Sequence, residues 1–75
     1  MAGLSEYRFT MAASVSSMEA VGKASKALQS AGIASYIVGS RHTFKIQVRQ
    51  EDRARARAAL QASARTGHYT LVLSP

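Results

Sequence analysis

Few residues of this chain are of the types that carry out covalent chemistry or hold metal ions. There is no cysteine, and neither His42 nor His68 lies at metal-ligand spacing from another ligand. A metal site needs three or four converging donors, so both histidines are interpreted as surface residues. Ser14, Ser16 and Ser17 lack the flanking glycines of a nucleophile elbow, and no base is evident for them. We therefore expect no enzyme activity, no metal site and no cofactor.

The distribution of positive charge is the strongest functional signal. The net charge is +6, and residues 41–75 carry seven of the ten lysines and arginines. A basic half attracts nucleic acid, acidic proteins or anionic surfaces through its long-range field. The alternative is a solvated surface rich in arginine and alanine, as in a GC-biased bacterial or phage protein.

Length and composition predict one small domain. The 75 residues suit a single domain, with residues 1–5 as an N-terminal tail. Hydrophobic residues make up 47% and aromatic residues only 7%, so we expect alanine-rich helices packed closely on a sheet. The N-terminus has no signal-peptide pattern, and no apolar run approaches the ~20 residues that span a bilayer. These features predict a cytoplasmic protein with no membrane contact.

Alternation of apolar and polar residues predicts four strands. They are expected at residues 7–11, 33–38, 42–49 and 68–73. In the first and third strands, the side chains turned toward the core are expected to be Tyr7, Phe9, Met11, Phe44, Ile46 and Val48. The opposite, open side of the sheet should then hold Arg8, Thr10, Thr43, Lys45, Gln47, Arg49, His68 and Thr70.

Two amphipathic helices separate these strands. A capping box at residues 16–19 begins the first helix, and Gly32 ends it in a left-handed conformation. Acidic residues 51–52 open the second helix, where negative charge favours the positive end of the helix dipole, and Gly67 ends it. The buried stripe of the second helix is expected to hold Ala56, Leu60 and Ser63 or Ala64.

An internal repeat points to the fold. A shift of 35 residues superposes Phe9 on Phe44, Met11 on Ile46, Gly32 on Gly67, Tyr36 on Leu71 and Val38 on Leu73. Two βαβ units in tandem, each with a right-handed crossover, form the ferredoxin-like βαββαβ fold. We therefore predict an α+β domain with a four-stranded antiparallel sheet, two helices on one face, and the first and third strands central.

The open sheet face suggests nucleic-acid binding, since its positive and hydrogen-bonding groups suit a phosphate backbone. The leading residues for this function are Arg8, Arg41, Lys45 and Arg49. The RNA-recognition motif shares the topology and stacks bases on exposed aromatics of its central strands. The alternation turns Phe9 and Phe44 toward the helices instead, so we expect no base-stacking platform.

The edges of the sheet suggest a protein partner. Residues 33–38 carry no charge, and residues 68–73 carry only the histidine, whereas natural edge strands are usually protected by lysine, proline or bulges. Pairing with another strand would satisfy their backbone groups. We predict a homodimer or another β-augmented assembly, with Tyr36 among the contacts. The alternative is a monomer with short, twisted edges.

The second helix carries a basic stripe. Arg53 and Arg57 lie one turn apart and share a face, while Arg55 and Glu51 form an i,i+4 pair. A solvated face is the default interpretation. The alternative is contact with an anion or an acidic partner, which makes Arg53 and Arg57 candidate binding residues.

Two families share segments with this chain. Ala31-Gly-Ile-Ala-Ser-Tyr36 and the stretch from Ile46 to Leu60 resemble the small prokaryotic signal-transducing proteins related to the PII nitrogen regulators, over residues 17–62. That resemblance implies a regulatory protein. Only residues 39–41 stand where the PII nucleotide-binding loop would follow the second strand, so no effector site is carried over.

The second resemblance is to the SPOR domain, which binds peptidoglycan and is also βαββαβ. Residues 7–14, followed by the capped helix, are similar to its first half, and residues 44–49 to its third strand. The glycine that usually follows the strand in that family is missing in both halves. The resemblance implies glycan binding outside the cytoplasmic membrane.

These observations favour a non-catalytic regulatory or protein-interaction module, bacterial or phage, that uses an edge strand and its basic surface. Nucleic-acid binding through the open sheet face is the first alternative. Peptidoglycan binding of the SPOR type is the second.

Overall fold

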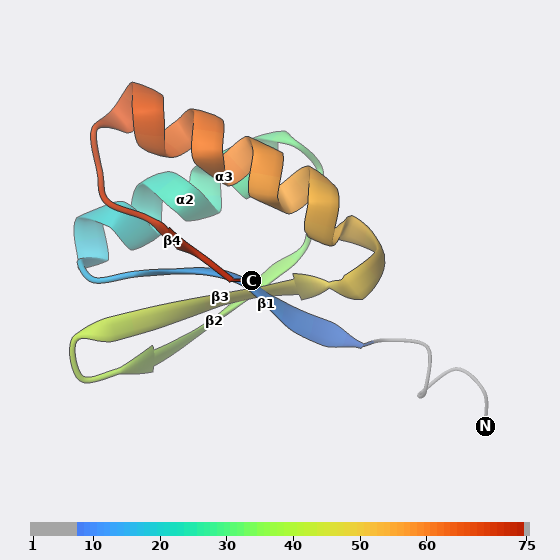
Figure 1. Cartoon of the computed structure of the whole chain (residues 1–75), viewed down its shortest axis with the longest axis horizontal. Helices are drawn as coiled ribbons and strands as arrows, with labels where there is room; N and C mark the ends of the chain where they lie inside the picture. Colours follow the sequence, from blue (N-terminus) through green and yellow to red (C-terminus); the bar gives the residue numbers. More distant parts are fainter. Residues whose placement is uncertain (1–7, 75) are drawn as a thin grey trace.

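The computed structural model describes residues 8–74, and it has two layers (Figure 1). Strands β1 (Phe9–Val15), β2 (Ser35–Ser40), β3 (Thr43–Arg49) and β4 (Val72–Leu73) form one antiparallel sheet in the order β2-β3-β1-β4. Helices α2 (Met18–Ser30) and α3 (Arg53–Gly67) cover one face, and a 3₁₀ turn, η1 (Gln50–Asp52), precedes α3. The ferredoxin-like prediction is confirmed, with the first and third strands central.

The core between the two layers is small and rich in alanine. Its largest fully buried side chains are Leu28, Ile46, Val48 and Leu60. Around them lie the buried alanines Ala12, Ala13, Ala20, Ala24 and Ala56. Alanine has the smallest apolar side chain, so the helices approach the sheet closely. Burial of each larger side chain contributes roughly 1.5–3 kcal/mol.

The start of α2 differs by one residue from the prediction. The cap is Ser17, whose hydroxyl accepts a hydrogen bond from the backbone N–H of Ala20 at 3.1 Å. Ser16 does not take this place because β1 continues to Val15, which leaves both serines for the turn. The end of α2 agrees with the prediction, since Gly32 follows it with φ +73°.

Helix α3 follows the acidic turn η1, and its buried residues are Ala56 and Leu60, as predicted. Its end is shifted by one residue. Gly67 is still helical, and His68 takes the left-handed conformation with φ 56°. An added Cβ at Gly67 would lie 3.2 Å from Lys23 Cδ, so the glycine makes room for a lysine of α2.

A bulge in β1 reverses the side on which its large residues lie. The pairing with β3 shifts between Met11 and Ala13, and both Ala12 and Ala13 are buried. The extra residue changes the alternation, because side chains alternate between the faces of a strand. Phe9 and Met11 therefore lie on the open side instead of in the core, and that part of the prediction is wrong. The predicted place of Tyr7, like the N-terminal tail, lies outside the described residues.

The two edge strands differ in length. β2 pairs with β3 along its whole length, whereas β4 pairs with β1 only through Val72 and Leu73. The predicted fourth strand is too long, because the residues that precede β4 are still bonded to α3. Tyr69 donates its backbone N–H to Ala64 O at 3.2 Å and its hydroxyl to Ser63 Oγ at 2.9 Å.

Within residues 8–74, no helix has both the length and the apolar character that crossing a membrane requires.

Candidate binding surface on the open sheet face

The candidate site is the side of the sheet that the helices leave uncovered, here called the open face. Residues paired across antiparallel strands lie on the same side, so the buried pair Ala13 and Ile46 marks the helix side. The pairing then assigns to the open face Phe9, Met11, Ser14, Tyr36, Val38, Thr43, Lys45, Gln47, Arg49 and Val72.

Two aromatic rings stand together on the open face. Phe9 of β1 and Tyr36 of β2 are 45% and 61% exposed, and their ring centroids lie 6.2 Å apart in an edge-to-face arrangement. The two strands flank β3, where Gln47 pairs with Tyr36. The predicted burial of Phe9 is therefore wrong, and that of Phe44 is right, since Phe44 packs against the core.

Further apolar side chains extend this surface. Val38 of β2 is 39% exposed and Val72 of β4 is 62% exposed. Together with Phe9 and Tyr36, they are four of the five large hydrophobic residues that residues 8–74 expose. This gathering of exposed apolar side chains makes the open face the candidate binding surface.

Cations follow β3 along the same surface. Lys45 is exposed and pairs with Ser14 and Val38, while Arg49 pairs with Phe9. Arg41 lies in the tight turn before β3, with φ 50°. The described carboxylates, Glu19, Glu51 and Asp52, lie on α2 and η1, so the charged side chains of the described open face are all positive.

A small hollow lies where β1, β3 and the segment before β4 meet. Its volume is about 120 Å³, and its lining includes four hydroxyl-bearing residues: Ser14, Ser16, Thr43 and Thr70. Val72 completes it on the β4 side. Hydroxyl groups both donate and accept hydrogen bonds, so this end of the open face suits phosphate or sugar oxygens.

The other residues predicted for the open face divide into two groups. Thr43, Lys45, Gln47 and Arg49 of β3 lie there as predicted. Thr10 does not lie there, because it pairs with the buried Val48 and so faces the helix side of the sheet. His68 ends α3 and Thr70 precedes β4, so neither takes the predicted place in a strand. Arg8 is exposed just before β1, and its carbonyl accepts from Gln50 N at 2.9 Å.

Arg53 and Arg57 lie away from the open face and do not form a solvated stripe. Both are half-buried, and their guanidinium groups donate to the same carbonyl oxygen, Ser74 O, at 3.2 and 2.6 Å. They fasten the end of β4 to α3. The predicted pair of Arg55 with Glu51 is also replaced, since Arg55 lies 3.6 Å from Asp52 instead.

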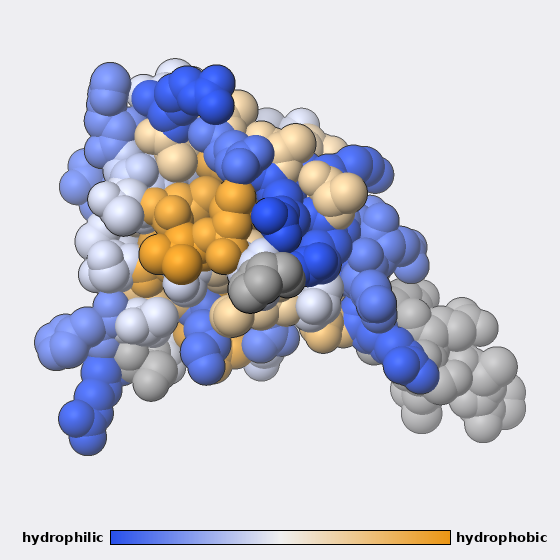
Figure 2. Space-filling view, viewed as in Figure 1, coloured by the Kyte–Doolittle hydropathy of each residue, from blue (hydrophilic) through white to orange (hydrophobic). Residues whose placement is uncertain are grey.

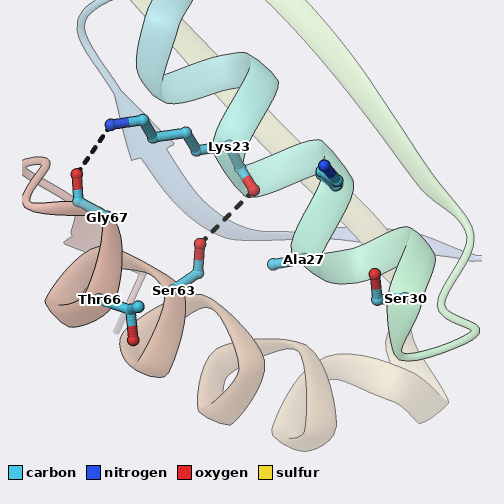
Figure 3. Close-up of a pocket in the computed structure, with 7 residues that line it drawn as sticks. Lys23, Ala27, Ser30, Ser63, Thr66 and Gly67 are labelled. Atoms are coloured by element: carbon cyan, nitrogen blue, oxygen red, sulfur yellow. Dashed lines mark hydrogen bonds between the residues drawn. The ribbon is translucent and has the colours of Figure 1, made fainter.

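The helix side carries a shallow groove between α2 and α3 (Figure 3). Lys23 reaches across it and donates from Nζ to Gly67 O at 2.8 Å, and Ser63 Oγ donates to Lys23 O at 3.5 Å. These bonds join the two helices. Lys23, Ser63 and Gly67 therefore serve the fold, and the described lining of the groove contains no aromatic ring, so the open face is the better candidate site.

Among residues 8–74, no group of three or more histidine or carboxylate side chains is placed to hold a metal ion. Comparisons with protein-family models, with curated proteins and with solved structures found no match for this chain. The resemblances to the PII-related proteins and to the SPOR domain stay predictions.

Proposed function

We propose that this protein is a non-catalytic module that binds single-stranded nucleic acid on its open face. The observation that carries the proposal is the exposed pair of Phe9 and Tyr36 beside the cations of β3, on a face where the described charges are all positive. This pairing of rings with positive charge supports nucleic acid over the protein partner that the sequence favours.

Each part of the face suits one part of a nucleic-acid strand. A base stacked on an aromatic side chain contributes about 1–3 kcal/mol and needs no particular base, since every base has a π-face. Lys45 and Arg41 supply positive charge for the phosphates, and the hydroxyl hollow supplies hydrogen bonds. From Arg49 to Thr43 the surface spans about 20 Å, at a rise of ~3.4 Å per residue.

The arrangement also predicts the kind of recognition. On β3, the open face carries Lys45, Gln47 and Arg49, and its aromatic rings come from β1 and β2. This differs from the RNA-recognition motif, whose signature aromatics are on the two central strands. With stacking and charge as the main contacts, we expect little sequence preference and a strong dependence on salt.

Two further proposals are a partner at a strand edge and a cytoplasmic location. A protein partner or a second copy at a strand edge is supported by β2, an uncharged edge strand along Ser35–Ser40. A cytoplasmic location suits both nucleic-acid and protein partners. Peptidoglycan binding gains no support from the geometry of the open face.

The test is fluorescence anisotropy with a fluorescein-labelled oligothymidylate of about 12 nucleotides, within the ~4–16 nucleotides that small β domains occupy. Tyr36→Ala removes one stacking surface, and it should weaken binding about 5- to 150-fold, which corresponds to 1–3 kcal/mol. Met18→Ala is the control, because Met18 is also an exposed apolar residue but begins α2. It should leave the affinity unchanged.

Salt separates charge from stacking in the same assay. Lys45→Gln should lower the slope of log affinity against log salt by about 0.7, the value for one phosphate contact on a single strand. Lys26→Gln, at an exposed position of α2, should leave the slope as it is. No rise in the anisotropy of the oligonucleotide at low salt, or equal losses of affinity in the control and test variants, overturns the proposal.

A further inference from the structure

A second surface lies along the outer side of β4, away from the aromatic pair of the open face. Figure 2 shows an apolar patch where Figure 1 draws β4 and the segment before it, with hydrophilic side chains beside it. Leu71 and Leu73 are half-buried there against the core, and Val72 is exposed. A shallow groove lies between this segment and α3, and its lining consists of Gln61, Ala64 and Arg65 of α3 and residues 69–71 and 73.

Among residues 8–74, no strand lies beside the outer side of the β4 backbone. β4 is the last strand of the sheet, and Ser74 donates its N–H to Ala12 O of β1 at 3.0 Å. Backbone groups of successive residues in a strand point to opposite sides, so the N–H and C=O of Leu73 point away from β1. An edge of this kind pairs readily with an added strand.

The charge beside the groove is positive. Arg57, Gln61 and Arg65 follow one another at four-residue steps along α3, and Gln61 and Arg65 line the groove itself. The groove's described lining contains no carboxylate. A partner with acidic side chains therefore matches the charge of this surface.

We propose that the outer edge of β4 binds an extended acidic segment of another protein, which adds a fifth strand to the sheet. An apolar side chain of that segment fills the groove beside Leu71 and Leu73, and a carboxylate two residues along contacts Arg65. This class of partner differs from nucleic acid, and the groove lies away from Phe9, Tyr36 and Lys45; the two surfaces meet at Thr70 and Val72.

A second copy of the chain fits the edge less well. The edge segments that another copy would offer, residues 33–40 and 69–74, contain no carboxylate for Arg65. The net charge of +6 also makes two copies repel each other. Nucleic acid has no stacking surface here, since Tyr69 is half-buried and its hydroxyl is bonded to Ser63.

The test uses a fluorescein-labelled peptide that repeats valine, threonine, glutamate and threonine. As a strand, it places valine and glutamate on one side and threonine on the other. Two control peptides carry lysine in place of glutamate, or N-methyl groups that remove alternate backbone donors. Binding is followed by anisotropy, and strand addition by amide hydrogen exchange at Leu71 and Leu73.

The acidic peptide should bind, the two control peptides should not, and exchange at Leu71 and Leu73 should slow when the peptide is bound. Arg65→Glu should weaken binding about tenfold, because it puts a negative charge beside the carboxylate. Lys26→Glu, the same charge change on α2, should have a much smaller effect. Both residues are exposed, so neither variant disturbs the core.

Four results overturn the proposal. The first is no saturable binding of the acidic peptide below about 1 mM, the weak end of measurable affinity. The second is equal binding of the lysine peptide or the N-methyl peptide. The third is slower exchange at Leu73 when the protein concentration alone rises, and the fourth is slower exchange at Leu73 when oligothymidylate is added. The third result assigns the edge to a second copy and the fourth to nucleic acid. Because Lys45 and Tyr36 lie elsewhere, failure here leaves the nucleic-acid test unaffected.

Discussion

The two βαβ halves share one pattern of residues but place their large side chains on opposite sides of the sheet. In the first half, Phe9 and Tyr36 lie on the open face. Their equivalents in the repeat, Phe44 and Leu71, pack against the core. In β1, two of the three buried positions hold alanine, Ala12 and Ala13, and the third holds Val15.

A fold of this size has few large residues, and it divides them between the core and the exposed surface. The second half supplies most of the strand contribution to the core, through Ile46 and Val48. The first half is then free to expose aromatic residues. The bulge at Ala12 makes this division possible, because it turns the end of β1 inward while its start faces outward.

Substitutions at equivalent positions of the two central strands should differ most in their effect on the free energy of unfolding. Ile46→Ala should lower the free energy of unfolding by about 2–5 kcal/mol, because it leaves a cavity in the core. Met11→Ala, at the equivalent position of the repeat, should cost about 1 kcal/mol or less, since Met11 lies on the open face. Urea denaturation measures both, and equal losses would contradict the difference between the halves.

The next effect concerns the two edge strands. β2 is held by its long pairing with β3, whereas β4 depends on Arg57, which donates to Ser74 O at 2.6 Å. Arg57→Ala should cost about 1–2 kcal/mol, the lower range for a bond from a charged donor that is only half-buried. Amide exchange at Ser74, whose N–H is bonded to Ala12 O, should quicken, while exchange in β2 stays slow.

Arg55→Ala is the matched control for this prediction. Arg55 is exposed and makes a 3.2 Å bond to Ala31 O and a 3.6 Å contact with Asp52. Its loss should cost less than about 1 kcal/mol, as is usual for exposed ion pairs. If Arg55→Ala quickens exchange at Ser74 as much as Arg57→Ala does, β4 is not fastened by Arg57.

The smallest effect distinguishes the starts of the two helices. Ser17→Ala removes the hydroxyl that caps α2 and should cost about 1 kcal/mol. Asp52→Ala, at the start of α3, should cost about 0.5 kcal/mol, because Asp52 makes no side-chain cap bond and contributes only its charge near the helix N-terminus and its 3.6 Å contact with Arg55. Thermal unfolding of both variants decides the order, with Ser16→Ala as a control that should resemble the parent protein.

The features that depend on regular alternation were predictable from the sequence. The residues of β3 alternate without interruption, and both their side and their central place agree with the structure. The helices were predictable within a few residues, because their buried positions recur at helical spacing and Gly32 follows α2.

The exposed aromatic pair was not predictable by the same means. Ala12 and Ala13 are both small and apolar, so neither marks which side of the strand it faces, and the bulge leaves no signal in the alternation. Without the bulge, the pattern buries Phe9. For Tyr36, its place in a predicted edge strand was a weak indication that its side chain is available for contacts. The bonds from Arg53 and Arg57 to Ser74 join distant parts of the chain, which residue spacing on a single helix does not reveal.

The most direct test of the open face as the binding site is a two-dimensional NMR titration of the isotope-labelled protein with the oligothymidylate. If the open face binds the strand, we expect the signals of Phe9, Tyr36 and Lys45 to shift first and furthest, while those of α2 and α3 change little. Shifts centred on the helices, or no shifts at low salt, would contradict it.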